Sequence, residues 1–305
     1  MKDPRNCLIL RCLTGLLPVA MAGCSPQPVP DPEHLAEIES WRAERQKRLE
    51  SETGWLTLVG LHWLEAGENR FGTGPDNEIV LPEGTAPAMA GSFFLDGDRV
   101  TVRAPAHAGL TLEGDPVTER ELRDDDPGPV DELLLNDLRL YVIERGDSYA
   151  VRIKDPNSPA RKGFSGMDYF SIDPAYRVEA AFVAHEEPRE VKIPTVMGTV
   201  ETMLSPGYVE FSLHGKAQSL EPVVESLDDD QLFFIFRDET SGKETYGAGR
   251  FLYTDMPANG KVALDFNKAY NPPCVFTPYA TCPLPPKQNS IPARIEAGEK
   301  TYGEH

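Results

Sequence analysis

Short β-like segments separated by turn residues recur along most of this chain, and they constrain the fold more than any other feature. Asp96–Gly97 lies between Ser92–Leu95 and Arg99–Arg103, which is typical of a tight hairpin. Further strands are expected at Trp55–Val59, Leu61–Leu64, Leu138–Glu144, Tyr149–Lys154, Tyr208–Leu213, Leu232–Phe236, Tyr246–Tyr253, Lys261–Phe266 and Ala293–Ile295. Many short strands with glycine and proline punctuation predict a mainly β protein.

One segment, residues 31–50, departs from this pattern and is expected to form an amphipathic helix. Asp31 is a favoured N-cap residue and Pro32 suits the first helical position. Leu35, Ile38 and Trp41 recur at helical spacing, so we expect this face, and Trp41 in particular, to pack on the β body. The alternative is a helix that binds a partner.

The first residues are typical of a targeting signal. Residues 1–23 hold a basic start and a short apolar stretch that is too short to cross a bilayer as a helix. The stretch ends in Met21–Ala22–Gly23 before Cys24, which resembles the lipobox of bacterial lipoproteins. This resemblance implies a signal peptide at 1–23, a lipid on Cys24, a proline-rich tether at 24–30 and a membrane-anchored protein facing the periplasm. Ser25 after the cysteine favours the outer membrane of the cell envelope.

The cysteine count follows from that assignment. Once the signal is removed and Cys24 carries lipid, Cys274 and Cys282 remain as an even pair in an oxidising compartment. We therefore expect a disulfide between them. Their spacing is not the Cys-x-x-Cys of a redox or zinc motif, so neither role is expected.

The strongly acidic balance limits the partners. The chain has a formal net charge of −19 at pH 7. Such a protein repels nucleic acid and anionic lipid headgroups, so neither is an expected partner, and the lipid on Cys24 would supply the membrane attachment.

The segment 155–176 is expected to divide the chain. It carries Pro156, Pro159, Gly163 and Gly166 among charged residues and has no clear periodicity. It is interpreted either as a linker between β units at 51–154 and 155–305, or as a long loop that covers a site.

The start of the first unit resembles forkhead-associated domains. The pattern Phe71–Leu81 has the glycine-to-asparagine spacing and the following apolar strand of that family. The resemblance implies a β-sandwich over about residues 55–154, and we expect this sandwich to pack with a second antiparallel β unit. Thr73 stands where the family has an arginine that grips phosphothreonine, and Ala86–Met89 stands where a serine is expected, so phosphopeptide binding is not implied.

A broader resemblance runs from Trp41 to about Tyr302. The segments Gly54–Leu64, Lys154–Pro159, Phe236–Arg250 and Asp265–Cys282 are similar to the family called domain of unknown function 1684. The resemblance implies one evolutionary unit over most of the chain, and it implies no activity.

Several catalytic motifs are missing from the sequence. Gly163–Phe164–Ser165–Gly166 is not a Gly-x-Ser-x-Gly elbow, and Gly242–Lys243 does not complete a phosphate-binding loop. Gly247–Gly249 lacks the third glycine of a dinucleotide site, and the histidines form no metal-binding pair. We therefore expect no cofactor and no metal.

The densest group of functional residues lies between Phe236 and Cys282. If strands 246–253 and 264–268 pair across the Asn259–Gly260 turn, Arg250 and Asp265 share a surface. Clustered cations in an acidic chain suggest a bound anion. The candidate ligand-binding residues are Arg237, Lys243, Tyr246, Arg250, Asn267, Tyr270 and Asn271. An alternative interpretation makes the cations internal ion-pair partners of nearby carboxylates.

Three classes of function are compatible with this cluster. The preferred hypothesis is a binding protein that holds a small anionic or polar ligand in a cleft of the second β unit. A hydrolase is the alternative, with Asp238 or Asp265 as general base and Ser241 or Lys243 as nucleophile or charge stabiliser. A structural envelope protein that docks a partner is the third.

Overall fold

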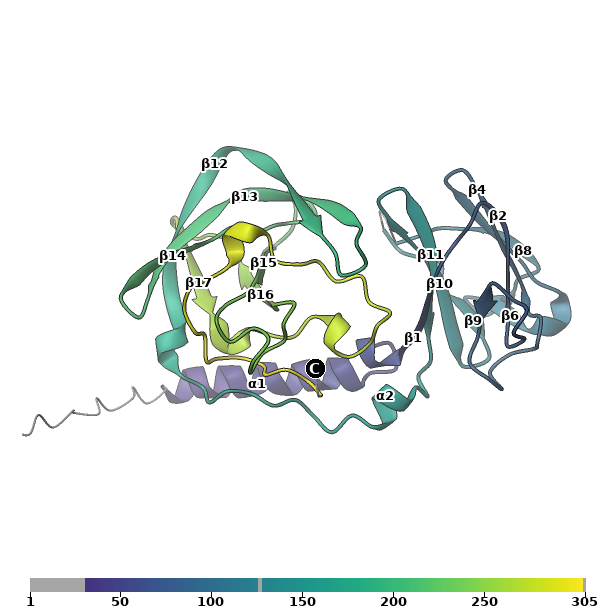
Figure 1. The fold of residues 1–305 in the computed structure, drawn as a ribbon, viewed down its shortest axis with the longest axis horizontal. Helices are drawn as coiled ribbons and strands as arrows, with labels where there is room; N and C mark the ends of the chain where they lie inside the picture. The colour runs from purple at the N-terminus through teal and green to yellow at the C-terminus, as the bar shows by residue number, and fades with distance from the viewer. Residues whose placement is uncertain (1–30, 126–127, 304–305) are drawn as a thin grey trace, which may run out of the picture.

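The computed structural model describes residues 31–125 and 128–303. The predicted signal peptide, the tether and the lipidation residue Cys24 lie outside the described residues. Figure 1 shows two β units side by side, with one long helix along the base of the second unit and ending beside the first. No helix among the described residues is long and apolar enough to span a bilayer. The fold is mainly β, as the sequence predicts.

The base helix, α1, runs from Pro32 to Glu50 and begins at the predicted N-cap, where the Asp31 side chain accepts a 3.3 Å hydrogen bond from Glu33 N. Its buried residues are His34, Ile38, Arg45 and Leu49. The predicted apolar face is therefore wrong in part, because Leu35 is 37% exposed. A histidine and an arginine occupy the buried face, since each finds a carboxylate partner in the second unit.

The first unit is a sandwich of two sheets. A six-stranded sheet has the order β1-β11-β10-β9-β6-β7 and a five-stranded sheet the order β3-β2-β4-β5-β8. Their strands are β1 (Leu58–Trp63), β2 (Gly67–Gly72), β3 (Ile79–Val80), β4 (Gly91–Asp96), β5 (Arg99–Arg103), β6 (Leu110–Leu112), β7 (Asp115–Pro116), β8 (Glu119–Leu122), β9 (Leu133–Leu135), β10 (Leu138–Arg145) and β11 (Ser148–Lys154). Apolar side chains of both sheets, such as Phe93 and Val151, form one core. The β4–β5 hairpin expected from Asp96–Gly97 is present, and β10 and β11 form a second hairpin.

The second unit holds a four-stranded sheet, β14-β13-β12-β17, and a two-stranded sheet, β15-β16. The strands are β12 (Arg177–Pro194), β13 (Val200–Leu213), β14 (Lys216–Leu220), β15 (Gln231–Phe236), β16 (Arg250–Asp255) and β17 (Lys261–Asp265). Residue 246 lies outside β16, residues 293–295 are not a strand, and β17 pairs with β12 rather than with β16. These three predictions were wrong. The sequence interpretation also missed β12, because most of its side chains are exposed and many of them are charged, so the strand lacks an apolar alternation.

Residues 155–176 form a linker. The segment holds the short helix α2 (Pro159–Lys162) and then runs beside α1 into the second unit (Figure 1). Arg42 of α1 donates a 2.9 Å hydrogen bond to the Phe170 carbonyl, and Phe170 N donates to the Gly298 carbonyl. No residue of the segment lines the large cavity described below, so the alternative of a covering loop is not supported.

Candidate functional site

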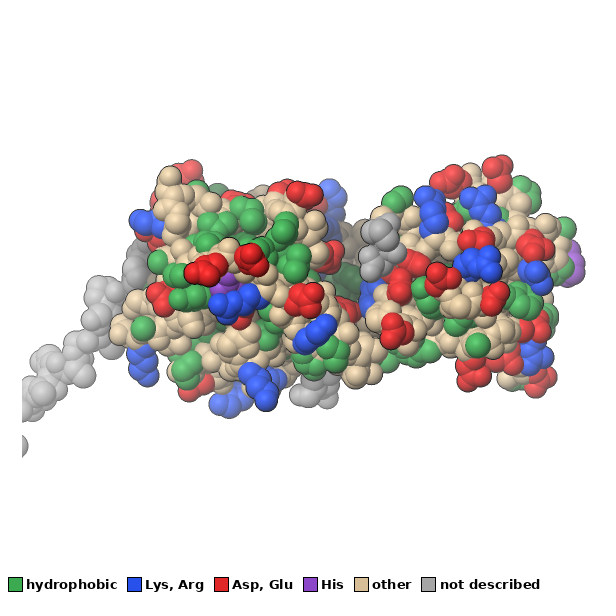
Figure 2. Space-filling view, turned by 90° about the horizontal axis from the view of Figure 1, so that it is seen from above, with side chains coloured by type: hydrophobic (Ala, Val, Ile, Leu, Met, Phe, Trp, Pro, Cys, Tyr) green, Lys and Arg blue, Asp and Glu red, His purple; other side chains and the backbone are tan. Residues whose placement is uncertain are grey.

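A cavity of about 1410 Å³ lies where α1 and the two β units meet. Seen from above, the units form two lobes with a hollow between them (Figure 2). The lining comes from α1, from the β10–β11 edge of the first unit and from β13, β15, β16 and residues 280–283 of the second unit. The cavity is therefore assembled from segments that are far apart in the sequence.

Four aromatic side chains form one wall of the cavity, which we call the aromatic panel: Phe233, Phe251, Tyr253 and Tyr270. In β15 and β16, Leu232, Phe234 and Leu252 point into the core of the second unit. Because side chains alternate along a strand, their neighbours Phe233, Phe251 and Tyr253 face the cavity. Phe233 and Tyr253 are direct cross-strand partners, and their rings stack at 4.6 Å.

Tyr270 extends this wall without belonging to a strand. Its backbone exchanges two 2.9 Å hydrogen bonds with Phe251, which places its ring 6.5 Å from that of Tyr253 and almost parallel to it. Burial beside Glu225 and Asp229 raises the pKa of Tyr253 to about 12, and burial raises the pKa of Tyr270 also. Both rings are therefore neutral phenols at neutral pH, able to stack and to exchange hydrogen bonds.

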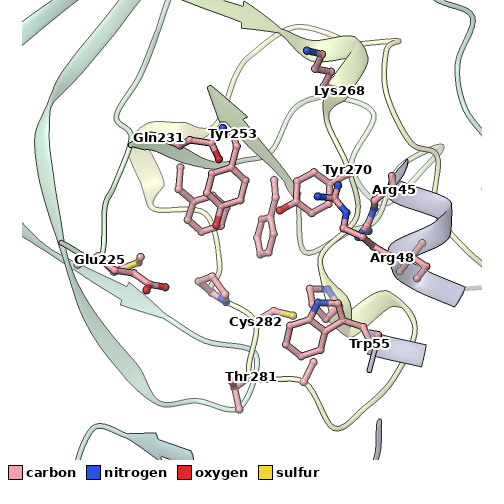
Figure 3. A pocket seen from close by; sticks show the side chains of 18 of the residues that line it. Arg45, Arg48, Trp55, Glu225, Gln231, Tyr253, Lys268, Tyr270, Thr281 and Cys282 are labelled. Carbon is pink, nitrogen blue, oxygen red and sulfur yellow. The ribbon is translucent and has the colours of Figure 1, made fainter. Parts of the chain in front are cut away.

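Arginines of α1 approach the edge of the panel, as Figure 3 shows. The Arg45 guanidinium lies 4.6 Å from the Tyr270 ring centre and is held by Glu299 at 3.0 Å and by the Asn271 carbonyl at 3.0 Å. Arg48, one turn further on, is exposed. Among the described residues, no carboxylate lies within ion-pair distance of Arg48. The helix therefore presents one fixed and one available cation to the cavity.

Carboxylates line the cavity on every side: Glu37 and Glu44 on α1, Asp125 and Glu144 in the first unit, and Glu201, Glu225 and Asp265 in the second. Glu225 lies across the panel from the arginines of α1 (Figure 3). Glu201 of β13 lies 3.4 Å from Arg145, and burial raises its pKa. An anionic ligand is accordingly favoured only next to Arg48 and Arg152, two lining arginines for which the described residues supply no carboxylate within ion-pair distance.

The predicted cationic cleft does not exist as a unit. Arg250 is fully buried and donates to the Ala297 and Ile295 carbonyls, and it pairs with Asp238 at 3.3 Å. The alternative interpretation, an internal ion pair, was the right one for this residue. Burial lowers the pKa of Arg250, and Asp238 opposes that effect.

The other predicted cations point elsewhere. Arg237 is exposed and donates a 2.7 Å hydrogen bond to the Gly247 carbonyl, while the exposed Lys243 donates to the Glu239 carbonyl. Neither lines the cavity, and Tyr246 does not line it either. Residues 237–249 form a compact series of turns that closes on itself, because Asp238 and Thr240 satisfy the local hydrogen bonds.

Asp265 and Tyr270 are the predicted site residues that line the cavity. Asn267 and Asn271 are fully buried structural residues: Asn267 bonds to the backbone of Asp173, and Asn271 to that of Lys300. Ser241 lies 3.4 Å from Asp238, outside the cavity. Asp238, Ser241, Lys243 and Asp265 therefore do not meet at one place.

The predicted disulfide is not formed in the structure, in which Cys274 and Cys282 are free thiols. They are nevertheless neighbours, because Cys274 N donates a 3.1 Å hydrogen bond to Cys282 Sγ. A hydrogen bond with Cys282 lowers the pKa of Cys274, whereas burial raises that of Cys282. Cys282 also lines the cavity (Figure 3).

The sequence interpretation missed the helix and the first unit as parts of the site. Arg48, Trp55 and Arg152 all line the cavity. The sequence did point to Trp55, because it lies in Gly54–Leu64, one of the segments that resemble domain of unknown function 1684. Across residues 31–125 and 128–303, no three His, Cys, Asp or Glu side chains are grouped so as to hold a metal ion.

Comparisons with known proteins find a family for part of the chain. Residues 162–300 match the family described as "Protein of unknown function (DUF1684)", a narrower range than the resemblance from Trp41 to Tyr302 implied. No curated protein matches the chain.

Three solved structures are similar in part. An uncharacterised protein of Haloarcula marismortui, solved by NMR, is 34% identical over 50% of this chain and 85% of its own, with a TM-score of 0.42. An FHA domain studied for phosphothreonine-dependent interactions is 22% identical over 32% of this chain and 95% of its own, with a TM-score of 0.22. The FhaA FHA domain, solved with an intracellular domain of another protein, is 20% identical over 30% of this chain and 96% of its own, also with a TM-score of 0.22. By the match over residues 162–300, the chain belongs to the DUF1684 family of proteins of unknown function.

Proposed function

We propose that this protein binds a small ligand that carries a flat ring and an anionic group, in the cavity between α1 and the two β units. The observation that carries the proposal is the aromatic panel, bordered by the available cation Arg48. An exposed stacked tyrosine beside an arginine offers a ring a face to stack on and an anion a partner.

The lining supports binding at the panel rather than throughout the cavity. Pockets for small molecules commonly enclose about 300–1,000 Å³. The cavity of about 1410 Å³ is larger, so a small ligand fills only part of it. Tyr253 is 44% exposed, unlike Phe233 and Phe251, which are buried beside it. The accessible stacking surface is therefore concentrated on Tyr253 and the neighbouring Tyr270.

A hydrolase receives less support from the same geometry. Among the four candidate catalytic residues, Asp265 alone lines the cavity. Both of its oxygens are engaged, Oδ2 with His34 and Oδ1 with Asn267. A general base needs a free carboxylate oxygen within reach of the proton that it removes.

We also propose that the protein is a lipoprotein of the cell envelope, anchored through Cys24. The support is in the sequence: a basic start, a short apolar stretch and small residues before Cys24. Incorporation of labelled palmitate that is lost in Cys24→Ala tests this part. Equal labelling of the variant would contradict it.

Binding can be followed through the tryptophans, because Trp41 and Trp55 line the cavity. We suggest titrating the purified full-length chain with phenylacetate while recording tryptophan fluorescence and the melting temperature. Binding should change the fluorescence and raise the melting temperature, and Tyr253→Ala should weaken it by about tenfold through loss of stacking.

Two controls sharpen this test. Tyr253→Phe keeps the ring and should retain most of the affinity, whereas Met256→Ala changes an exposed residue that does not line the cavity and should have no effect. Equal affinity of the wild type and Tyr253→Ala would remove the panel from the proposed site.

A further inference from the structure

Two arginines of the first unit converge on one hydroxyl group of the second. Arg145 Nε lies 3.3 Å and Arg152 Nη2 3.2 Å from Oγ1 of Thr281. All three side chains line the cavity, and we call them the Thr281 cluster. One neutral oxygen thus accepts hydrogen bonds from two cations. Two cations that share one acceptor repel each other.

The two arginines differ in how their charge is balanced. Arg145 pairs with Asp125 at 3.0 Å and lies 3.4 Å from Glu201. Arg152 is 3% exposed, and no carboxylate of the described residues lies within ion-pair distance of it. Its Nε is buried and has no hydrogen-bond partner. A buried charge that lacks a counter-ion is costly, and so is a buried donor that lacks an acceptor.

The surroundings of Arg152 offset this cost only in part. Its guanidinium lies 5.7 Å from the Trp55 ring centre and 5.9 Å from that of Tyr141. Aromatic faces at this range attract a cation but supply no negative charge. Asp125 and Glu201 both contact Arg145, so Arg152 has no carboxylate in direct contact, and its buried Nε is a ready donor for an oxyanion.

We propose that the Thr281 cluster is the subsite that recognises the oxyanion of the ligand, a carboxylate or a phosphate ester, with Arg152 as its principal donor. The inference rests on the proposed function, because it assigns the anionic end of the same ligand. Cys282, which follows Thr281, lies in Figure 3 between Thr281 and the ring of Tyr270. The ring of the ligand then lies on the panel while its anion reaches the seam between the units.

This placement gives the ligand a mechanical role as well. Arg145 and Arg152 belong to β10 and β11 of the first unit, whereas Thr281 and the panel belong to the second. An oxyanion at the cluster neutralises the repulsion between the two arginines at the contact of the two units. Bound ligand therefore holds the first unit against the second.

The test uses probes that separate the two parts of the ligand on the full-length chain. Sulfate has the anion without the ring, phenylacetamide has the ring without the anion, and phenylacetate and phenyl phosphate have both. Sulfate should raise the melting temperature more than chloride at equal ionic strength and should change tryptophan fluorescence. Phenylacetate and phenyl phosphate then distinguish a carboxylate from a phosphate site.

Arg152→Gln should weaken sulfate binding by about ten- to a hundredfold, while Tyr253→Ala should leave it unchanged. Without any anion, Arg152→Gln should melt at the same temperature as the wild type or higher, because an unbalanced buried charge is gone. If Arg152 had only a structural role, Arg152→Gln would lower the melting temperature. If Arg152→Gln does not fold, Thr281→Val takes its place with the same expected loss of sulfate binding.

The outcomes separate the two proposals. A lack of any specific sulfate effect on the wild type, or equal affinity for phenylacetamide and phenylacetate, would overturn the oxyanion subsite and leave ring binding intact. Sulfate binding that depends on Arg152, without binding of either ring-bearing acid, would support the subsite and overturn the proposed ring ligand.

Discussion

His34 Nε2 lies 2.6 Å from Oδ2 of Asp265, although 231 residues separate them in the chain. Both residues are buried, 6% exposed in each case. The pair fixes the start of α1 to the end of β17, and Arg45 with Glu299 fixes its middle. Because α1 carries one side of the cavity, the position of Arg48 depends on these two buried contacts.

Removing the histidine should loosen this attachment. His34→Ala leaves the buried Asp265 carboxylate without one of its partners, which we expect to cost about 3 kcal/mol of unfolding free energy. Urea unfolding followed by circular dichroism measures it. Leu35→Ala, at an exposed neighbouring position, should change stability by less than about 0.5 kcal/mol. Equal effects of the two substitutions would rule out a special role for the pair.

Arg250 should be a stability residue rather than a ligand-binding one. Arg250→Ala leaves Asp238 buried without its cation and frees two carbonyls, so we expect a loss of about 3–5 kcal/mol. Arg237→Ala removes one exposed hydrogen bond and should cost less than about 1 kcal/mol. Thermal and urea unfolding compare the two. A stable Arg250→Ala variant with weakened phenylacetate binding would restore the original sequence hypothesis.

The acidity of Glu201 should control anion binding. Burial raises its pKa, so the folded protein holds this proton at pH values where an ordinary carboxylate has lost it. As the pH falls into the acidic range, Glu201 should be protonated before an ordinary carboxylate, and its repulsion of an anion at the Thr281 cluster weakens. Sulfate affinity should therefore rise over this range.

Glu201→Gln supplies the matched control. The variant should bind sulfate more tightly at neutral pH and should have a flatter pH dependence than the wild type. The raised pKa of Glu201 also sets the sign of its effect on stability. Its contribution to the free energy of unfolding is fully present below about pH 4.5 and is lost as the pH rises through its folded pKa. An unchanged pH dependence in Glu201→Gln would assign the effect to another carboxylate.

Cys274 and Cys282 remain the expected disulfide partners under oxidising conditions. Closing the loop from 274 to 282 should stabilise the protein by about 2–3 kcal/mol. The mass, the thiol content and the melting temperature before and after reduction measure this. In the reduced protein, iodoacetamide should modify Cys274 first, since its pKa is lowered and Cys282 is buried. Equal melting of the oxidised and reduced forms would leave the pair without a stabilising role.

The local parts of the fold could be predicted from the sequence. Asp31 and Pro32 mark the start of α1, and Asp96–Gly97 marks the β4–β5 hairpin, because capping and turn preferences act over a few residues. The long-range pairing could not be predicted. Whether β17 pairs with β16 or with β12 depends on packing between segments more than 60 residues apart, for which no local pattern exists.

The site was predicted only in part for a related reason. Arg250 and Arg152 are both arginines in strands, and the sequence does not indicate that the first has a buried carboxylate while the second lacks one. That difference arises from the tertiary position of Asp238. Tyr270 was identified because it lies in the densest polar segment of the chain. Arg48 was not considered, because the helix was expected to pack on the β body or, alternatively, to bind a partner.

The attachment of α1 also determines the order in which this chain can complete its structure. The helix is made among the first described residues, yet its buried polar groups wait for Asp265 and Glu299, the latter 254 residues after Arg45. The sandwich of residues 58–154 has its own core and can fold long before then. A nascent chain, or one shortened before Glu299, therefore holds a finished first unit beside an undocked charged helix, and the cavity is complete only once Pro283 is in place and α1 has docked.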